Sequence, residues 1–182
     1  MLSQFSSGEG RLTLKDFFDV PGDVYPVGRL DHDSEGLLIL TNDKTFNHRL
    51  LNPAFAHERE YWVQVDGLIT DEAISDVQKG VDITADGRSY RTKKCRGAFL
   101  KPTFVIPERD PPIRFRKNIP TSWIQLVLQE GKNRQVRKMT AAVGFPTLRL
   151  IRYRIGDCNI EGLKPGEMRI FSQKEISHLL FK

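Results

Sequence analysis

The sequence predicts an α+β protein of one domain, or of two tightly fused halves. Short β-prone runs alternate with helical segments in the order β-β-α-β-α-β…β-α-β. This order is neither the repeated βαβ of a parallel sheet nor the pattern of an all-β barrel. The 182 residues, 39% of them hydrophobic, are enough for a proper core. No internal repeat, low-complexity tract or Gly/Ser linker marks a domain boundary.

The first third of the chain predicts two helices around a pair of strands. Residues 12–18 are typical of a short amphipathic helix. Two apolar runs bracket a polar loop and predict buried strands, at residues 25–30 and 37–41. Asn42-Asp43 is suited to cap a helix that runs to about residue 51, where Asn52-Pro53 ends it.

The middle of the chain predicts a strand, a helix and an irregular β region. Residues 59–67, REYWVQVDG, are rich in β-formers and end at a glycine. Thr70 is suited to cap a helix through Lys79, with two acidic residues in its first turn. Residues 81–106 have a ragged β pattern with a turn signal at Asp86-Gly87.

The last third predicts two strands that flank a helix, and then a terminal helix. The proline-rich residues 107–123 exclude a long helix and predict an ordered excursion. The remaining elements are predicted as a strand at 123–128, a helix at 133–143 ending at Gly144, a strand at 149–155, a turn at 164–167 and a helix from Gln173.

The composition excludes several classes of protein. No apolar run approaches the roughly 20 residues that span a bilayer, so we expect no membrane partner. The N-terminus lacks the basic-then-apolar layout of a signal peptide. Two distant cysteines without a CxxC are typical of reduced thiols in a cytoplasmic protein. The four histidines lack the spacing of metal ligands, so we expect no metal.

The charge is unevenly distributed along the chain. The formal net charge is +5, but residues 1–90 hold 8 Lys and Arg against 16 Asp and Glu. Residues 91–154 hold 16 basic residues against 3 acidic ones, and residues 155–182 are balanced. Such asymmetry favours a surface that faces phosphates, with nucleic acid as the partner. A solvated basic face without a ligand is the alternative.

An acidic loop is the first candidate site. The run GRLDHDSEG places Asp31, Asp33 and Glu35 within five residues. Clustered oxygens suit a hard cation, but the run lacks the glycine and the ligand spacing of a calcium loop. The other interpretations are turn carboxylates with a structural role, or a catalytic carboxylate at the end of a buried strand. On a strand, Arg29 would share a face with Asp31. The loop alone does not distinguish among these three interpretations.

A basic helix is the second candidate site. In the run EGKNRQVRKM, at residues 130–139, Val136 and Met139 belong to the apolar stripe. Arg134 and Arg137 lie on a neighbouring face, where they either meet phosphates or reach a buried carboxylate. A solvated basic helix is the structural alternative.

Three motifs resemble those of one family. GRLDHDSEGLLILTND and LQEGKNRQVRKMTAAVGFPTLRLIR resemble the signature motifs of the RsuA/RluB/RluE/RluF-type bacterial rRNA pseudouridine synthases. REYWVQVDG is similar to the tyrosine-bearing strand of that family. The resemblance covers about residues 20–170, and the motifs follow in the family's order and spacing. Residues 110–123 further resemble a subgroup that modifies one uridine of 23S rRNA.

The resemblance implies a fold and an activity. The fold would be the pseudouridine synthase catalytic fold, with a mixed, mostly antiparallel sheet flanked by helices and a central active-site cleft. Residues 1–182 would form one catalytic domain of two fused halves. The reaction would isomerise a specific uridine in 23S rRNA or its precursor particle, in the cytoplasm, without cofactor or metal. We expect a monomer.

The resemblance also assigns roles to individual residues. Asp31 matches the catalytic aspartate of the family, and Arg137 matches the basic residue that pairs with it. Arg29 matches the arginine that flips the target base, and Tyr61 matches the tyrosine that stacks on the flipped base. Without the resemblance, Tyr61 would be interpreted as an ordinary strand aromatic. Leu150, or another apolar residue of its strand, is expected at the floor of the pocket.

Further basic and polar residues are expected to contact RNA. They are Arg114, Arg116, Lys117, Lys132, Asn133, Arg134 and Lys138. Family members usually begin with a strand carrying a Lys-Pro motif, which this sequence lacks, and no S4-like RNA-binding module is evident. We therefore expect the central sheet to lack one strand. Two other functions remain as alternatives: a noncatalytic factor for rRNA binding or ribosome assembly, and a metal-dependent phosphohydrolase.

Overall fold

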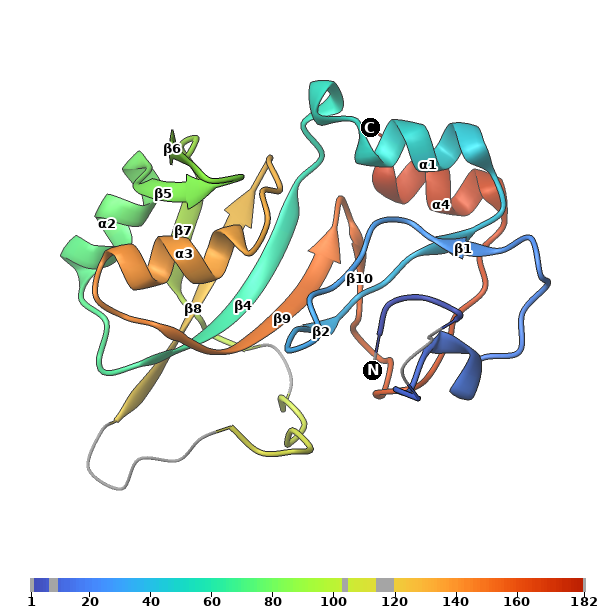
Figure 1. Cartoon of the computed structure of the whole chain (residues 1–182), viewed down its shortest axis with the longest axis horizontal. Coiled ribbons are helices and arrows are strands. Elements are labelled where there is room, and N and C mark those ends of the chain that lie inside the picture. The colour runs from blue at the N-terminus through green and yellow to red at the C-terminus, as the bar shows by residue number, and fades with distance from the viewer. Residues whose placement is uncertain (1, 7–9, 103–104, 114–119, 182) are drawn as a thin grey trace.

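A six-stranded sheet forms the centre of the molecule (Figure 1). The computed structural model describes residues 2–6, 10–102, 105–113 and 120–181. The long strand β4 (Arg59–Asp66) lies between β8 (Thr121–Leu128) and β9 (Thr147–Ile155) and is antiparallel to both. The shorter strands are β2 (Glu35–Gly36), β7 (Arg96–Phe99) and β10 (Cys158–Asn159). Of these, β2 pairs with β9 in parallel. The expected mixed, mostly antiparallel sheet is confirmed.

One half of the molecule packs around β8 and β4 (Figure 1). It contains α2 (Asp71–Lys79), α3 (Gln135–Ala142) and the hairpin of β5 (Asp82–Ala85) and β6 (Arg88–Arg91). Thr70 caps α2 by accepting a hydrogen bond from the Ala73 N–H, as predicted. The buried side chains of this half include Val63, Val77, Leu126 and Met139.

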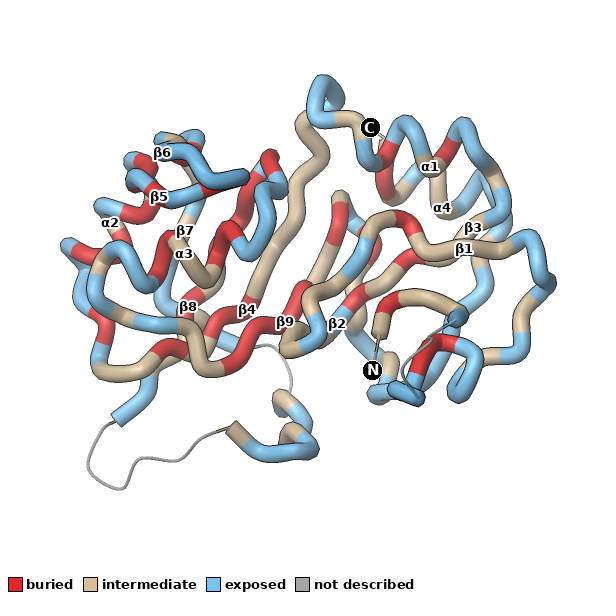
Figure 2. The backbone as a smooth tube through the Cα atoms, in the orientation of Figure 1, coloured by how far each residue is buried: buried red, intermediate tan, exposed pale blue. Residues whose placement is uncertain are grey.

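The other half packs around the far end of β9. It contains α1 (Lys44–Leu51), α4 (Gln173–Leu180) and the short pair β1 (Tyr25–Pro26) and β3 (Leu40–Thr41). Asp43 caps α1, as predicted. The core side chains of this half include Phe46, Leu50 and Leu180. Because β9 supplies Leu150 to the first core and Ile155 to this one, the sheet joins the two halves (Figure 2).

The N-terminal predictions need correction. The helix predicted over 12–18 is only a 3-10 turn, η1 (Leu14–Asp16). The strands predicted over 25–30 and 37–41 contain two paired residues each. Gly28 has a φ of +70°, which turns the chain out of extended backbone soon after the first of them. Arg29 and Asp31 therefore lie in a loop, and the argument from strand alternation does not apply to them.

The remaining elements agree with the predictions to within a few residues. The helix predicted from residue 133 begins at Gln135, since Arg134 has a left-handed φ of 52°. The described residues between 105 and 120 form neither helix nor strand. A second 3-10 turn, η2 (Pro53–Phe55), follows α1. In the described part of the chain, no helix has the length and apolar character needed to cross a membrane.

Candidate active site

A cavity of about 370 Å³ brings together four distant segments of the chain. Its walls come from residues 27–34, 50–61, 128–136 and 150–155. Six of the predicted site residues line it: Arg29, Asp31, Tyr61, Lys132, Asn133 and Arg134. The two motif regions that were separated by about 100 residues in the sequence therefore meet at one site.

The loop that carries Asp31 is fastened to β9. Gly36 lies so close to β9 that an added Cβ would be 2.3 Å from the Arg152 carbonyl oxygen. The Leu37 N–H donates to that same oxygen at 2.8 Å. The Ser34 N–H donates to the Asp31 carbonyl at 2.9 Å, which closes a turn. The Asp31 side chain lies at the cavity wall, and 33% of its surface is exposed.

Arg134 contacts two carboxylates of this loop. Its guanidinium makes two parallel hydrogen bonds to the Asp33 carboxylate, both at 2.9 Å, and lies 3.8 Å from an Asp31 oxygen. The hydrogen bond from Arg134, together with the charge of Arg137, lowers the pKa of Asp33 against the opposing effect of burial. The αL backbone of Arg134 is the kind of strain that functional sites retain.

Arg137 does not pair with Asp31 as the resemblance implied. Its Nη2 donates to the Asp33 carbonyl at 2.8 Å and lies 3.4 Å from the Asp33 carboxylate. Burial lowers the pKa of Arg137, and Asp33 offsets part of that effect. At the turn of His32-Asp33, Asp33 is directed toward α3. Arg137 therefore contacts Asp33, whereas Arg134 lies next to Asp31.

Buried hydrogen bonds fix the loop before α3. Glu130 accepts from the Tyr90 hydroxyl at 2.6 Å, from the Lys93 N–H at 2.8 Å and from the Gln135 amide. The Lys132 N–H donates to Gln135 at 2.9 Å. This network holds the exposed side chains of Lys132 and the neighbouring residues at the rim of the cavity.

The paired strands β4 and β9 supply the more buried wall of the cavity. Tyr61 and Arg152 are direct partners across these strands. Burial lowers the pKa of Arg152, and the nearby Tyr61 side chain offsets part of that larger effect. Leu150 also lines the cavity, as expected of its floor. Sequence reasoning missed Arg59 and Arg152. Alternation along REYWVQVDG would have placed Arg59 beside Tyr61, whereas finding Arg152 required the strand register.

The other predicted contacts lie elsewhere. Lys138 is on α3 and does not line the cavity, and Arg114, Arg116 and Lys117 fall outside the described residues. Asp31, Asp33 and Glu35 do not converge: Glu35 points to Arg149, which binds it at 2.7 and 2.9 Å. Within the described residues, no group of three or more His, Cys, Asp or Glu is placed to hold a metal ion.

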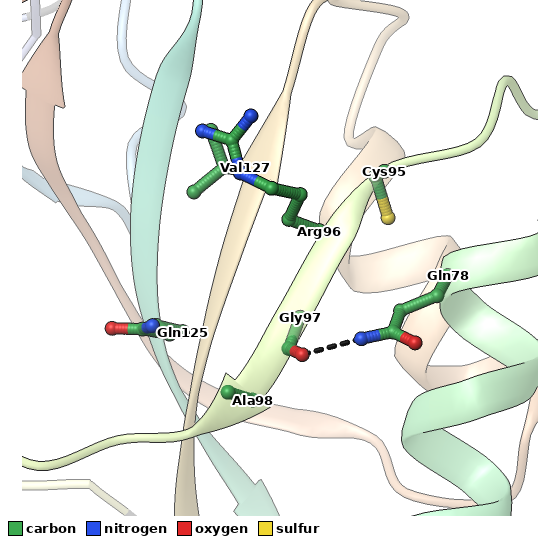
Figure 3. Close-up of a pocket in the computed structure, with 7 residues that line it drawn as sticks. All are labelled: Gln78, Cys95, Arg96, Gly97, Ala98, Gln125 and Val127. Atoms are coloured by element: carbon green, nitrogen blue, oxygen red, sulfur yellow. Dashed lines mark hydrogen bonds between the residues drawn. The ribbon is translucent and has the colours of Figure 1, made fainter.

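A second hollow, of about 480 Å³, offers less chemistry (Figure 3). It lies against α2, β7 and β8. The Gln78 amide on α2 donates to the Gly97 carbonyl, and Arg96 is engaged by Glu58 at 2.7 and 2.8 Å. Burial raises the pKa of Cys95, in the same wall, to about 11. With its one cation already paired, this hollow has no group free for catalysis among the described residues that line it.

Comparison with known proteins identifies the family of the chain. The model of the RNA pseudouridylate synthase family matches residues 9–142. The chain is 48% identical over 168 residues to a ribosomal large subunit pseudouridine synthase E from Vibrio parahaemolyticus, covering 92% of this chain and 68% of that protein. It is 47% identical over 167 residues to a protein of the same name from Xanthomonas axonopodis pv. citri, covering 91% and 85%.

A solved structure supports the same assignment. A crystal structure of a pseudouridylate synthase superposes with a TM-score of 0.76 at 28% identity, covering 98% of this chain and 69% of the other. The fold, the motif order and the similar sequences agree. This chain belongs to the RNA pseudouridylate synthase family.

Proposed function

We propose that this chain isomerises a specific uridine of 23S rRNA to pseudouridine, with Asp31 as the catalytic carboxylate. The observation that carries the proposal is the cavity in which Asp31 and Tyr61 meet under a basic rim. The large-subunit synthases to which the chain is 47–48% identical support the substrate class.

The reaction needs only the residues of such a site. The bond between ribose C1′ and uracil N1 breaks, the uracil turns, and a bond from C1′ to C5 forms. C5 then loses its proton and N1 gains one, so the product is an isomer of uridine. Atoms and electrons balance without a cofactor or metal. Asp31 must be ionised to attack C1′ or to take a proton from the sugar. Arg134, 3.8 Å from an Asp31 oxygen, places a positive charge beside that carboxylate.

The target base must leave the RNA stack to reach Asp31. Extrusion of a base costs a few kcal/mol. We assign Tyr61 as the surface on which the flipped uracil stacks and Arg29 as the residue that fills its place. Arg29 is exposed at the rim whereas Tyr61 lies inside, which suits these two roles. Lys132, Asn133 and Arg134 are placed to contact the phosphates around the extruded nucleotide.

We further propose that residues 1–182 act as one catalytic domain. The strand β9 contributes to both hydrophobic cores, so the two halves share their central sheet. The proposed partner is 23S rRNA or its precursor particle in the cytoplasm, and the proposed active form is a monomer, since all the assigned groups come from one chain.

Treatment of large-subunit rRNA with the purified chain tests this function. Pseudouridine is detected by carbodiimide adduct formation and primer extension. The wild-type protein is expected to produce one new stop. Asp31→Asn, which keeps the shape of the side chain but removes its charge, is expected to bind RNA and to produce no stop. Asp76→Asn makes the same change on the exposed face of α2 and is expected to keep full activity.

Two results would contradict the proposal. One is pseudouridine formed by a folded Asp31→Asn protein. The other is a wild-type protein that binds rRNA tightly and never modifies it, which would favour the alternative of a noncatalytic assembly factor. Undiminished activity in excess chelator is expected, and dependence on added magnesium would instead support the phosphohydrolase chemistry.

A further inference from the structure

Arg152 is a buried cation on the wall of the proposed catalytic cavity. Only 6% of its surface is exposed, yet it lines the same cavity as Asp31 and Tyr61. Its Nε donates to the Leu37 carbonyl at 2.8 Å, and Tyr61 is its neighbour across the strand pair. Both partners are uncharged, so neither compensates the positive charge.

The charge of Arg152 has no counterion among the residues that the structure describes. Among the described residues, no carboxylate lies within 4.0 Å of its guanidinium nitrogens. Its Nη2 has no hydrogen-bond partner there and almost no solvent-exposed surface, so hydration does not replace the missing partner. Burial lowers the pKa of Arg152, and nearby Arg59 adds to this effect. An unpaired buried charge is costly, and proteins tolerate it where a ligand supplies the opposite charge.

The depth of Arg152 distinguishes it from the other basic residues of the cavity. Arg29, Lys132 and Arg134 are exposed at the rim, where phosphates of a bound strand would pass. Arg152 lies beside buried Leu150 and opposite Tyr61, which places it at the level of the base. When the bond between C1′ and N1 breaks, its electron pair stays on uracil, and the negative charge spreads to the ring carbonyl oxygens.

We propose that Arg152 binds the flipped uracil and stabilises the negative charge that develops on its ring as the glycosidic bond breaks. This assignment rests on the proposed function of the same cavity. A guanidinium has five donors and no acceptor, so it fits the carbonyl oxygens of an anionic uracil. A preorganised charge aimed at developing charge typically accelerates a reaction by two to three orders of magnitude.

Single-turnover kinetics with saturating large-subunit rRNA test the assignment. Arg152→Met is expected to slow pseudouridine formation about 100-fold while the Kd for RNA changes less than about threefold. Arg152→Lys, which keeps a cation, is expected to retain about tenfold more activity than Arg152→Met. The matched control is Arg154→Met on the same strand. Arg154 is paired with Glu58 and Glu60 and does not line the cavity, so this variant is expected to keep the wild-type rate.

The salt dependence of RNA binding separates a base contact from a phosphate contact. Loss of one phosphate contact lowers the slope of log K against log salt by about one. Arg152→Met is expected to keep the wild-type slope. A slope reduced by about one, or a folded Arg152→Met protein within threefold of the wild-type rate, would overturn the assignment.

Folding and the underlying activity are checked separately. Thermal unfolding followed by circular dichroism establishes that each variant is folded. If Arg152→Met and Arg152→Lys both fail to fold, Arg152 serves the fold and the assignment is wrong. If the wild-type chain itself forms no pseudouridine, both the proposed function and this assignment are wrong. An active wild type with an equally active Arg152→Met overturns the assignment alone.

Discussion

Replacement of Gly36 by alanine is expected to detach the Asp31 loop from the sheet. The added Cβ would lie 2.3 Å from the Arg152 carbonyl oxygen and 2.7 Å from its nitrogen. Both atoms belong to backbone in the middle of β9, so neither can move aside without breaking strand pairing. Gly36 also has a φ of +105°, which alanine rarely adopts.

The expected loss of stability follows from the contacts at this point. The shift would break the hydrogen bond from the Leu37 N–H to the Arg152 carbonyl, worth about 1 kcal/mol. It would also break the one from the Arg152 guanidinium to the Leu37 carbonyl, worth about 2 kcal/mol because the donor is charged. The left-handed backbone adds about 1 to 2 kcal/mol. The free energy of unfolding should therefore fall by about 4 to 5 kcal/mol, a large part of the 5 to 15 kcal/mol of a typical protein.

Gly87→Ala is the matched control. Gly87 has a φ of +74° in the β5–β6 turn, and a Cβ there meets nothing within 4 Å, so only the backbone penalty of about 1 kcal/mol applies. Urea unfolding gives the two free energies, and pseudouridine formation gives the activity. Because Gly36 anchors the Asp31 loop, a displacement of about 1 Å should also slow the reaction about 100-fold. Equal unfolding free energies for the two variants would refute this reasoning.

Three further predictions concern charge and reactivity. The pKa of Asp33 is lowered in the folded state, so its stabilising contribution is present above its unfolded pKa of about 3.9 and is lost as the pH falls through the folded pKa. The free energies of urea unfolding of wild type and Asp33→Asn should therefore differ at pH 6 and converge in acid. A difference that stays constant with pH would contradict this. Lys132→Ala should lower the salt slope of rRNA binding by about one, whereas Lys79→Ala on α2 should not; equal slopes would place Lys132 away from the phosphates. Because the pKa of Cys95 is raised to about 11, about a thousandth of its thiol should be thiolate at pH 8. Cys95 should therefore react slowly with Ellman's reagent until the protein is unfolded. Rapid labelling of Cys95 in the native protein would contradict its burial.

Local signals in the sequence were sufficient for most of the regular elements. The caps Asp43 and Thr70 predicted where α1 and α2 begin, because a side chain and a backbone N–H a few residues apart decide a helix start. β-rich runs likewise predicted β4 and β8. The short strands near Asp31 were overestimated, since the backbone of Gly28 redirects the chain in a way that its neighbours do not reveal.

The candidate site was predictable in its motifs but not in its pairings. The motifs placed Asp31 and Arg134 in one cavity. They did not tell which arginine of α3 stands next to Asp31, because that depends on the αL backbone of Arg134 and on the turn at Asp33. Arg152 was missed because it meets Tyr61 only through pairing of β4 with β9, and a register shift at Glu60/Tyr61 interrupts simple counting along these strands.

The fastening of the Asp31 loop to β9 has a consequence for the newly made protein. The Leu37–Arg152 contact joins residues 115 positions apart, and the Arg134–Asp33 contact joins residues 101 apart. Contacts of such long range form late, after the local hairpins and helices. During translation the Asp31 loop and Tyr61 leave the ribosome well before β9 exists, so the loop lacks the strand to which Gly36 and Leu37 attach. Synthesis of the last quarter of the chain is therefore the step at which the proposed active site first becomes complete, so a ribosome that stalls before Arg152 releases a product without it.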